Sequence, residues 1–404
     1  MAAEPGADWT DRILDLDVGP VAHGGHCVAR AAGAEVASGE AGAPGRGSGR
    51  VVFVRHALPG ERVRAVVTED AGGSFCRADT VAVLVASPAR VAAPCGWARA
   101  GGCGGCDLQH VEPAAQRELK AAVVAEQLRR LAGVEREVVV EELPGGPLGW
   151  RGRVRLAVDD EGRAGLRAHR SHDVLRIADC PLAPPGTLPG VLAREHPPGE
   201  IEVVRDADGT VHAGPGPGPV VQRAAGREWR LSPGTFWQVH PALADVLAGV
   251  VGEWAAAPAG GRAWDLYGGV GLLASVLAGQ VGAAGEVTVV ESARRAVDDG
   301  RVALADLPQV RWRVGRVERE LPGLPGPPDV AVADPPRSGL GRAVVDGLAA
   351  AGARRVVHVA CDPAALARDV ALLAGHGYGL ARLRAFDAFP MTHHVECVAL
   401  FERG

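Results

Sequence analysis

The chain has 404 residues, of which 47% are hydrophobic and 4% aromatic, so it is long enough for two or three domains with a sizeable core. Its formal net charge of −5 gives no global positive field, so any nucleic-acid contact must come from local arginine patches. It has no run of about 18 apolar residues, no signal-peptide layout, and too few cysteines (eight) for a disulfide-dense secreted scaffold. We therefore expect a cytoplasmic protein without a membrane segment.

Residues 10–90 have the pattern of a small β-barrel. Strand-like runs in RILDLDVGPVAHGGHCVAR are interrupted by glycines, and a polar, glycine-rich loop follows at 34–49. The stretch RVVFVRHALPGERVRAVVTED then predicts a strand, a Pro-Gly turn and another strand. Barrels of the oligonucleotide-binding type present a sheet face and loops to RNA. A purely structural β module is the simpler interpretation of the pattern alone.

Residues 91–230 predict a mixed α+β region. A cysteine-rich loop precedes VEPAAQRELKAAVVAEQLRRLAGV, whose apolar spacing is typical of a helix. Three strand-like runs follow it, RGRVRLAVDD, RAGLRAHR and DVLRIADC.

Residues 231–404 alternate between strand-like and helix-like runs, which predicts a doubly wound parallel sheet. The expected strands are Ala263–Tyr267, Glu286–Glu291, Val310–Gly315, Asp329–Asp334, Arg354–Cys361, Tyr378–Phe386 and His394–Phe401. The last two have no helix between them and should form an antiparallel pair at the edge. Ligands of such sheets bind beyond the carboxyl ends of the strands, so reactive residues are expected directly after a strand.

A cofactor site is predicted by AWDLYGGVGLLASVLA, which has the pattern of a strand, a glycine-rich turn and a helix. Gly268, Gly269 and Gly271 allow a ligand to approach the helix N-terminus closely. Glu291 ends the next strand, where a carboxylate can bind both hydroxyls of a ribose. A dinucleotide and S-adenosylmethionine both fit. The G-G-x-G spacing and Asp265 before the turn favour S-adenosylmethionine, with a purely structural turn as the alternative.

Two further side chains are expected at the same edge of the sheet. Asp334 ends a strand in VAVADPPRSGL, where it either faces a ligand or caps a turn. Cys361 ends the next strand in RRVVHVACDPAALARDV, followed by Asp362 as N-cap of a helix. A helix N-terminus lowers the pKa of a nearby thiol and favours the thiolate. A buried structural cysteine is the alternative.

The C-terminal strand carries an unexpected carboxylate. In AFDAFPMTHHVECVALFER, Glu396 lies within an otherwise apolar run, which is costly unless the group is paired or functional. Burial would raise its pKa and suit it to moving protons. His393 and His394 could instead bind a metal, but no third ligand is evident nearby.

A thiol, a methyl donor and a carboxylate base together fit methylation at C5 of uracil. C5 is too poor a nucleophile to attack a methyl sulfonium directly. Thiolate addition at C6 turns C5 into an enolate carbon that takes the methyl group. A base then removes the C5 proton, and elimination frees the thiol. A uracil within folded RNA would have to be flipped out to reach such a pocket.

The loop PCGWARAGGCGGCDLQH contains three cysteines in the spacing C-x7-C-x2-C, and IADCPLA supplies a possible fourth ligand. The four candidates are Cys95, Cys103, Cys106 and Cys180. Zinc and a [4Fe–4S] cluster can each be held by four thiolates, and coincidental cysteines are the remaining alternative. Three other cysteines are expected to be ordinary buried thiols: Cys27, Cys76 and Cys397.

Together, these residues resemble the RNA 5-methyluridine (uracil-C5) methyltransferases over nearly the whole chain. FVRHALPGERVRA is similar to the closing half of a TRAM domain, the family's N-terminal RNA-binding barrel. CGGCDLQH, with Cys95 and Cys180, resembles the family's [4Fe–4S] site. FWQVHPALADVL resembles the segment that opens its catalytic domain. The resemblance implies an S-adenosylmethionine-dependent enzyme that acts on RNA, with a Rossmann-like catalytic domain, and we expect a monomer.

The resemblance also assigns roles to single residues. Cofactor positions fall on Gln238, Tyr267, Glu291 and Asp334, beside Gly269 of the glycine-rich turn. ACDPAALARD resembles the nucleophile motif, which places that role on Cys361. FPMTHHVECVALF resembles the C-terminal motif, which places the general base on Glu396.

The chain departs from the family pattern at Asp362, which replaces the usual asparagine after the nucleophile. Its charge would raise the pKa of the thiol unless the side chain caps the helix. A further cofactor contact is expected within Arg313–Arg316. Members with cluster cysteines more often resemble the 23S rRNA enzymes, which makes 23S rRNA the expected target and tRNA the alternative. A non-catalytic RNA-binding iron–sulfur protein and a small-molecule methyltransferase with zinc are competing hypotheses.

Overall fold

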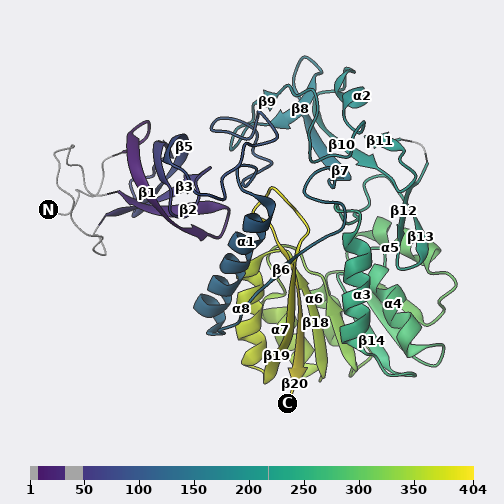
Figure 1. Ribbon diagram of the computed structural model, residues 1–404. Coiled ribbons are helices and arrows are strands. Elements are labelled where there is room, and N and C mark those ends of the chain that lie inside the picture. Colours follow the sequence, from purple (N-terminus) through teal and green to yellow (C-terminus); the bar gives the residue numbers. More distant parts are fainter. Residues whose placement is uncertain (1–7, 32–48, 217) are drawn as a thin grey trace. The chain divides into compact units, whose positions relative to one another are not determined.

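The computed structural model describes residues 8–31, 49–216 and 218–404, so most of the loop expected at 34–49 lies outside the described residues. The chain divides into two compact units, and Figure 1 labels its helices and strands. The first comprises residues 1–119, 167–175 and 390–393, and the second comprises 120–166, 176–389 and 394–404. The division into three segments made from the sequence stays a prediction. In the described ranges, no helix is both long and apolar enough to cross a membrane.

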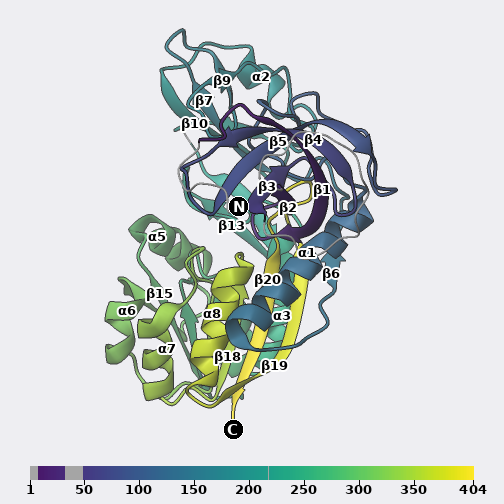
Figure 2. The same ribbon diagram turned by 90° about the vertical axis from the view of Figure 1, so that its left-hand side faces the viewer.

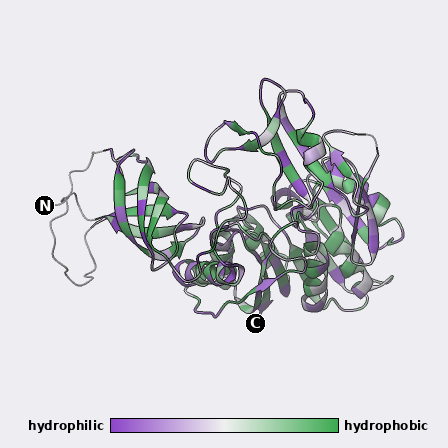
Figure 3. Ribbon diagram, turned by 45° about the horizontal axis from the view of Figure 1, so that its top comes forward, coloured by the Kyte–Doolittle hydropathy of each residue, from purple (hydrophilic) through white to green (hydrophobic). Residues whose placement is uncertain are grey.

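The first unit contains a closed five-stranded barrel with the strand order β1-β2-β3-β5-β4, which can be followed in Figure 2. The strands are β1 (Ile13–Ala22), β2 (His26–Ala31), β3 (Arg50–Arg55), β4 (Arg62–Glu69) and β5 (Phe75–Val85). Val52 and Val54 of β3 are fully buried, whereas Phe53 between them is partly exposed. This alternation of burial is the period of two expected for a sheet with one buried face, and Figure 3 shows both hydrophobic and hydrophilic residues along the barrel strands. The barrel predicted within residues 10–90 is therefore confirmed.

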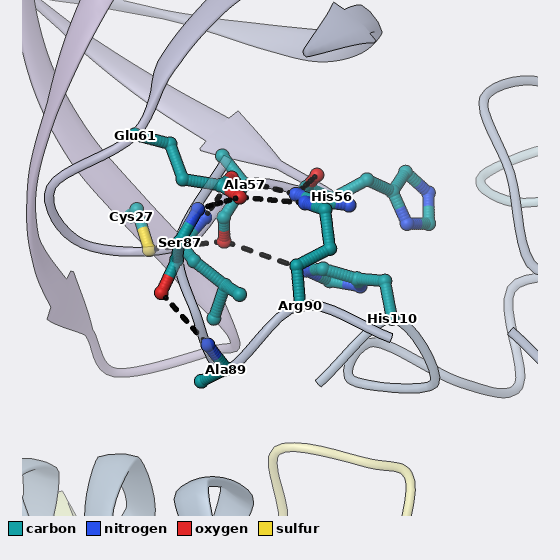
Figure 4. Close-up of polar contacts among 9 residues, drawn as sticks. Cys27, His56, Ala57, Glu61, Ser87, Ala89, Arg90 and His110 are labelled. Carbon is teal, nitrogen blue, oxygen red and sulfur yellow. Dashed lines mark hydrogen bonds and ion pairs between the residues drawn. The ribbon is translucent and has the colours of Figure 1, made fainter. Parts of the chain in front are cut away.

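A buried carboxylate at one end of the barrel ties the following loop to it (Figure 4). Glu61 is 1% exposed and accepts hydrogen bonds from the backbone N–H groups of Leu58 and Ser87. Arg90 donates to both of its oxygens at 2.6 Å. Cys27 Sγ, in the same network, donates to the carbonyl of Ala57. Bidentate pairing of this kind satisfies a charge that would be costly to bury alone, and it fixes the start of the cysteine loop.

The middle of the chain forms one long helix, a five-stranded sheet and a hairpin. The helix expected over residues 111–134 is present as α1 (Pro113–Gln127), which continues into η1 (Leu128–Ala132). The sheet has the order β11-β10-β7-β8-β9, with β7 (Arg153–Val158), β8 (Ala164–Arg167), β9 (Val174–Leu175), β10 (Gly199–Arg205) and β11 (Val211–Ala213). Helix α2 (Pro189–Leu192) and the hairpin of β12 (Val220–Ala224) and β13 (Arg227–Leu231) complete this part.

The C-terminal part is built on an eight-stranded sheet with the order β16-β15-β14-β17-β18-β20-β19-β6. Its strands are β6 (Val140–Glu142), β14 (Arg262–Leu266), β15 (Glu286–Glu291), β16 (Val310–Val314), β17 (Val330–Ala333), β18 (Arg355–Ala360), β19 (Tyr378–Asp387) and β20 (Glu396–Arg403). The five strands from β14 to β18 are parallel, which confirms the doubly wound sheet. β19 and β20 are antiparallel as predicted. They are not the edge of the sheet, however, because β6 pairs with the end of β19.

Helices cover both faces of this sheet because neighbouring strand residues alternate between two hydrophobic clusters. The helices are α3 (Leu243–Ala255), α4 (Leu272–Val281), α5 (Arg294–Ala303), α6 (Val317–Glu320), α7 (Gly341–Ala350) and α8 (Pro363–Ala374), with the short η2 (Leu321–Gly323). Val330 and Val332 pack in the cluster with α3 and α4. Ala331 and Ala333 pack in the cluster with α1, α7 and α8. Sequence order reverses between β14 and β17, which places a ligand crevice at their carboxyl ends.

Candidate active site

A cavity of about 940 Å³ lies in the second unit, beyond the carboxyl ends of the parallel strands. Its lining includes all seven residues predicted for cofactor binding and catalysis: Gln238, Tyr267, Gly269, Glu291, Asp334, Cys361 and Glu396. They come from segments as far apart as Gln238 and Glu396, so the fold brings them together from positions that are distant in the sequence. The volume is that of a site for a cofactor-sized ligand and part of a second one.

The glycine-rich turn after β14 is one wall of this cavity. Gly269 and Gly271 have positive φ angles of 56° and 86°, which side-chain-bearing residues rarely adopt. A Cβ atom at Gly268 would lie 2.5 Å from the Val289 side chain, so no larger residue fits there. The backbone N–H of Gly269 donates to Glu291 Oε2 at 3.0 Å, which holds the carboxylate beside the turn. The turn thus exposes backbone next to a carboxylate, as a ribose-binding site requires.

A second carboxyl group, Asp265, lies beneath this turn and is fully buried. Its Oδ2 accepts from the backbone N–H of Ala274 in α4, while Oδ1 has no hydrogen-bond partner. Burial raises the pKa of Asp265 to about 8, and the charges of Asp334 and Glu291 add to the rise. The group is therefore mostly protonated at neutral pH.

Cys361 follows β18 directly and lines the cavity just before α8 begins. Asp362 is the N-cap of α8, because its Oδ1 accepts from the backbone N–H of Ala365 at 2.7 Å. Burial, together with the charges of Glu396 and Asp334, raises the pKa of the Cys361 thiol to about 12. The predicted lowering of this pKa is therefore wrong, because burial and two acidic neighbours raise it.

Glu396 is the first residue of β20 and is 4% exposed. Burial raises its pKa well above the usual value, and the Asp334 charge adds to this, whereas Arg337 opposes it. Burial also raises the pKa of Asp334 to about 7. Burial thus raises the pKa of one thiol and of two carboxyl groups in the same cavity.

Comparison with known proteins agrees with this geometry. A family model described as tRNA (Uracil-5-)-methyltransferase matches residues 329–404, a stretch that contains Asp334, Cys361 and Glu396. A protein of Streptomyces avermitilis named "Uncharacterized RNA methyltransferase" is 44% identical, over 96% of this chain and 98% of that protein. The 23S rRNA (uracil(1939)-C(5))-methyltransferase RlmD of Pseudomonas entomophila is 35% identical, over 88% of this chain and 90% of its own.

The chain belongs to the RNA (uracil-C5)-methyltransferase family. The resemblance noted in the sequence is thereby confirmed, and so is the expectation of an enzyme. The crystal structure of the Pyrococcus abyssi tRNA (uracil-54, C5)-methyltransferase has the same fold, with a TM-score of 0.68. That similarity covers 87% of this chain and 95% of the other at 22% identity.

The four cysteines predicted as metal ligands divide between the two units. Cys95, Cys103 and Cys106 lie in the first unit and Cys180 lies in the second. In the part of the chain that the structure describes, no three His, Cys, Asp or Glu side chains are grouped so as to hold a metal ion. The [4Fe–4S] site on these four cysteines stays a prediction. Cys27, Cys76 and Cys397 are buried as predicted.

His393 and His394, the alternative metal ligands, are also not part of such a group of three side chains in the described residues. His393 Nδ1 instead lies 2.6 Å from Asp107 Oδ2, and its backbone N–H contacts the same oxygen. His394 lines the cavity, where its Nε2 is 3.3 Å from Arg337 Nη2. Two adjacent histidines thus have separate environments.

Two residues of the cavity lining were not predicted from the sequence to belong to the site. Arg337 and Phe389 line the cavity, although no role was predicted for either. Arg337 follows Asp334 by three positions in DPPRSGL, so its proximity to the strand end was the available signal. Within Arg313–Arg316, the stretch expected to hold a further cofactor contact, Gly315 and Arg316 line the cavity.

Proposed function

We propose that this protein methylates C5 of a uridine in RNA, using S-adenosylmethionine and a covalent intermediate on Cys361. The observation that carries the proposal is a single cavity lined both by the predicted nucleophile and base and by the predicted cofactor residues Gly269 and Glu291. Methylation of a base held by the nucleophile requires the methyl donor to reach C5 of the same base. Placement in one cavity meets this requirement.

The proposed reaction balances with the groups at hand. The Cys361 sulfur forms a bond to C6 of uracil while its proton passes to a carboxylate of the cavity. S-Adenosylmethionine supplies an electrophilic methyl group, which C5 takes, and S-adenosylhomocysteine leaves. Glu396 removes the C5 proton, the Sγ–C6 bond breaks, and the thiolate is released. General-base assistance of this kind is typically worth about 10²–10⁴-fold in rate.

The raised pKa of Glu396 fits the role of a base that acts inside a closed site. A carboxylate whose pKa is raised by burial holds a proton more strongly than one in water. Arg337 lowers the pKa of both Cys361 and Glu396, so it favours their ionised forms.

S-Adenosylmethionine fits the cradle formed by the glycine-rich turn. The Gly269 N–H and the Glu291 carboxylate lie where ribose hydroxyls are bound in sheets of this class. Gln238, Tyr267 and Asp334 complete the proposed contacts from the cavity wall. The Pyrococcus abyssi enzyme of similar fold was crystallised in complex with S-adenosyl-L-homocysteine, which supports this choice of cofactor.

The proposed RNA is 23S rRNA, because the RlmD proteins are 35% identical to this chain. tRNA is the alternative, since the family model and the archaeal structure are named for tRNA enzymes. The test is mass mapping of 5-methyluridine in 23S rRNA and tRNA from a strain that lacks the gene. The proposal predicts loss of one 23S rRNA modification, which returns with the wild-type gene and not with Cys361→Ala. Recovery of the modification with Cys361→Ala would contradict the covalent mechanism.

The barrel is proposed to be a TRAM-like domain that binds RNA. On its outer face, the rings of Phe53 and Phe75 meet edge-on at 5.5 Å, and Arg77 lies 5.7 Å from each ring. Phe75 is 44% exposed. Unpaired bases stack on such rings, and arginine can contact the phosphate beside them. Phe75→Ala should weaken RNA binding by about 1–3 kcal/mol, whereas Ile13→Ala, on another exposed apolar residue of the barrel, should not.

A [4Fe–4S] cluster on Cys95, Cys103, Cys106 and Cys180 is a proposal supported by their spacing in the sequence. Two N–H groups contact these sulfurs in the first unit, since Gly105 N donates to Cys103 Sγ at 3.3 Å and Gln109 Nε2 to Cys106 Sγ at 3.1 Å. Such donors favour the thiolate form that a cluster requires. Anaerobic purification should give a brown protein with four iron atoms per chain. A colourless protein with zinc would contradict it.

A further inference from the structure

The single lysine of the chain, Lys120, is buried in the second unit. Lysine and arginine together number 43, so every other cationic side chain of this kind is an arginine. The Lys120 side chain is 1% exposed. Lysine is among the residues most rarely buried, because removing an ammonium group from water is costly. Its position therefore requires an explanation.

Lys120 binds the end of strand β19. Its Nζ donates to Asp387 Oδ1 at 2.5 Å and to the backbone carbonyl of Phe389 at 3.0 Å. Val124 and Leu128, one and two turns further along the helical segment, belong to the hydrophobic cluster beneath the sheet. Lys120 thus lies on the same side of the helical segment as these apolar residues. At the end of β19 it makes two hydrogen bonds where an apolar side chain would only pack.

The two groups that accept hydrogen bonds from Lys120, on Asp387 and Phe389, lie in the segment that includes the cavity residue Phe389. Asp387 is the last residue of β19 and follows Phe386, which is the register partner of Glu396 on β20. Phe389 lines the cavity, and its ring meets those of Trp150 and His394 edge-on at 6.0 and 5.9 Å. Lys120 therefore holds the carboxylate of Asp387 and the backbone carbonyl of Phe389, in the short segment that places Phe389 in the cavity lining.

Stability alone does not explain an ion pair at this place. Replacing a buried ion pair with apolar residues of similar size is often neutral or stabilising, because the desolvation cost disappears. What apolar residues cannot replace is the hydrogen bond to the Phe389 carbonyl. Arginine is not equivalent either, since its planar fork is larger and donates in fixed directions.

We propose that Lys120 is a positioning residue for the methyl-transfer reaction. By holding Asp387 and the Phe389 carbonyl, it keeps Phe389 and Glu396 in place within the cavity that contains Cys361. This inference rests on the proposed function, because it assigns Glu396 the removal of the C5 proton. It adds a residue that touches neither RNA nor cofactor and acts through the end of β19.

The test uses the full-length chain with three changes. Lys120→Met removes the cation, and Lys120→Met/Asp387→Leu also removes the carboxylate that would otherwise be left buried and unpaired. Tyr378→Phe is the matched control, since Tyr378 is buried at the other end of β19 and donates to the carbonyl of Ala353 at 2.6 Å. Each variant is compared with wild type in thermal unfolding, in hydrogen exchange of residues 385–399, and in kcat and KM with unmodified 23S rRNA.

The double variant is the decisive one. We expect it to unfold near the wild-type temperature, to exchange faster over residues 385–399, and to lose about 10- to 100-fold in kcat. Its KM for S-adenosylmethionine should stay within about twofold of wild type, because the turn that carries Gly269 is not held by Lys120. Tyr378→Phe should lower the unfolding temperature while leaving exchange over 385–399 and kcat near wild type.

Wild-type kcat in the double variant, or unchanged exchange over residues 385–399, would overturn the positioning role. A fall in kcat that only parallels the fall in unfolding temperature, as in Tyr378→Phe, would also overturn it. The proposed function fails separately, through full methylation by Cys361→Ala. In that case the exchange measurement still decides whether Lys120 fixes the end of β19.

Discussion

The buried carboxyl group beneath the glycine-rich turn should make the stability of this protein depend on pH. Asp265 is fully buried, and its pKa rises from 3.8 to about 8 in the folded chain. Between these values the folded state binds a proton that the unfolded state has lost. Its contribution therefore lowers the free energy of unfolding as pH rises from about 4 to about 8, and it is constant outside that window.

The size of this effect follows from the pKa values. One pH unit within the window corresponds to ~1.4 kcal/mol for a single group, so the whole rise in the pKa of Asp265 is worth up to ~6 kcal/mol. Asp265→Asn keeps an oxygen for the Ala274 N–H and cannot ionise. We therefore expect the variant to lose stability at pH 5 relative to wild type, or to match it, and to gain several kcal/mol on it by pH 8.

The assay is urea unfolding of wild type and Asp265→Asn at half-unit steps from pH 5 to 8.5. Asp329→Asn is the control that should show no pH dependence over this range, because a hydrogen bond from the backbone N–H of Arg262 lowers the pKa of Asp329. Its contribution is present above about pH 4 and is lost in acid. If the difference between wild type and Asp265→Asn did not change with pH, the buried carboxyl would not be protonated in the folded state and the reasoning would be wrong.

Three further outcomes are expected at the cavity. Glu291→Ala should raise KM for S-adenosylmethionine at least about tenfold with a smaller change in kcat, since a bidentate ribose contact contributes mainly to binding; isothermal calorimetry measures the affinity directly. Asp362→Ala should lower the free energy of unfolding by about 1 kcal/mol through loss of the cap, whereas Asp362→Asn, which can also cap, should lose only a few tenths. Because burial holds the thiol pKa near 12, alkylation of Cys361 by iodoacetamide should accelerate continuously from pH 7 to 9.5, and a plateau below pH 8 would contradict that pKa.

Much of the catalytic sheet was predictable because its strands are short apolar runs that end in polar residues. The expected strand Glu286–Glu291 has the observed bounds, and Cys361 follows β18 as expected. A reactive group at a strand end can be located in this way, since parallel strands all present their carboxyl ends to one edge. Sequence pattern located five of the seven cavity residues, whereas Gln238 and Tyr267 came only from the resemblance to the family.

What could not be predicted depends on partners from distant parts of the chain. The pKa of the Cys361 thiol was predicted from its own helix, but burial and the charges of Glu396 and Asp334 decide it. The outer strand β6 was missed because three residues carry too little pattern, and its pairing with β19 is set by tertiary packing. The pairing of Lys120 with Asp387 joins positions 267 residues apart, which no local period can reveal.

The central claim is that Cys361 forms a covalent bond to the target uridine and that Glu396 is needed to release it. The most direct test is to incubate Glu396→Gln with unmodified 23S rRNA and S-adenosylmethionine, digest the product, and determine the mass of the peptide that contains Cys361. The account predicts a methylated uridine attached to this peptide, stable on a denaturing gel, and none in the double variant Cys361→Ser/Glu396→Gln. Normal turnover to 5-methyluridine by Glu396→Gln, or by Cys361→Ser alone, would contradict it.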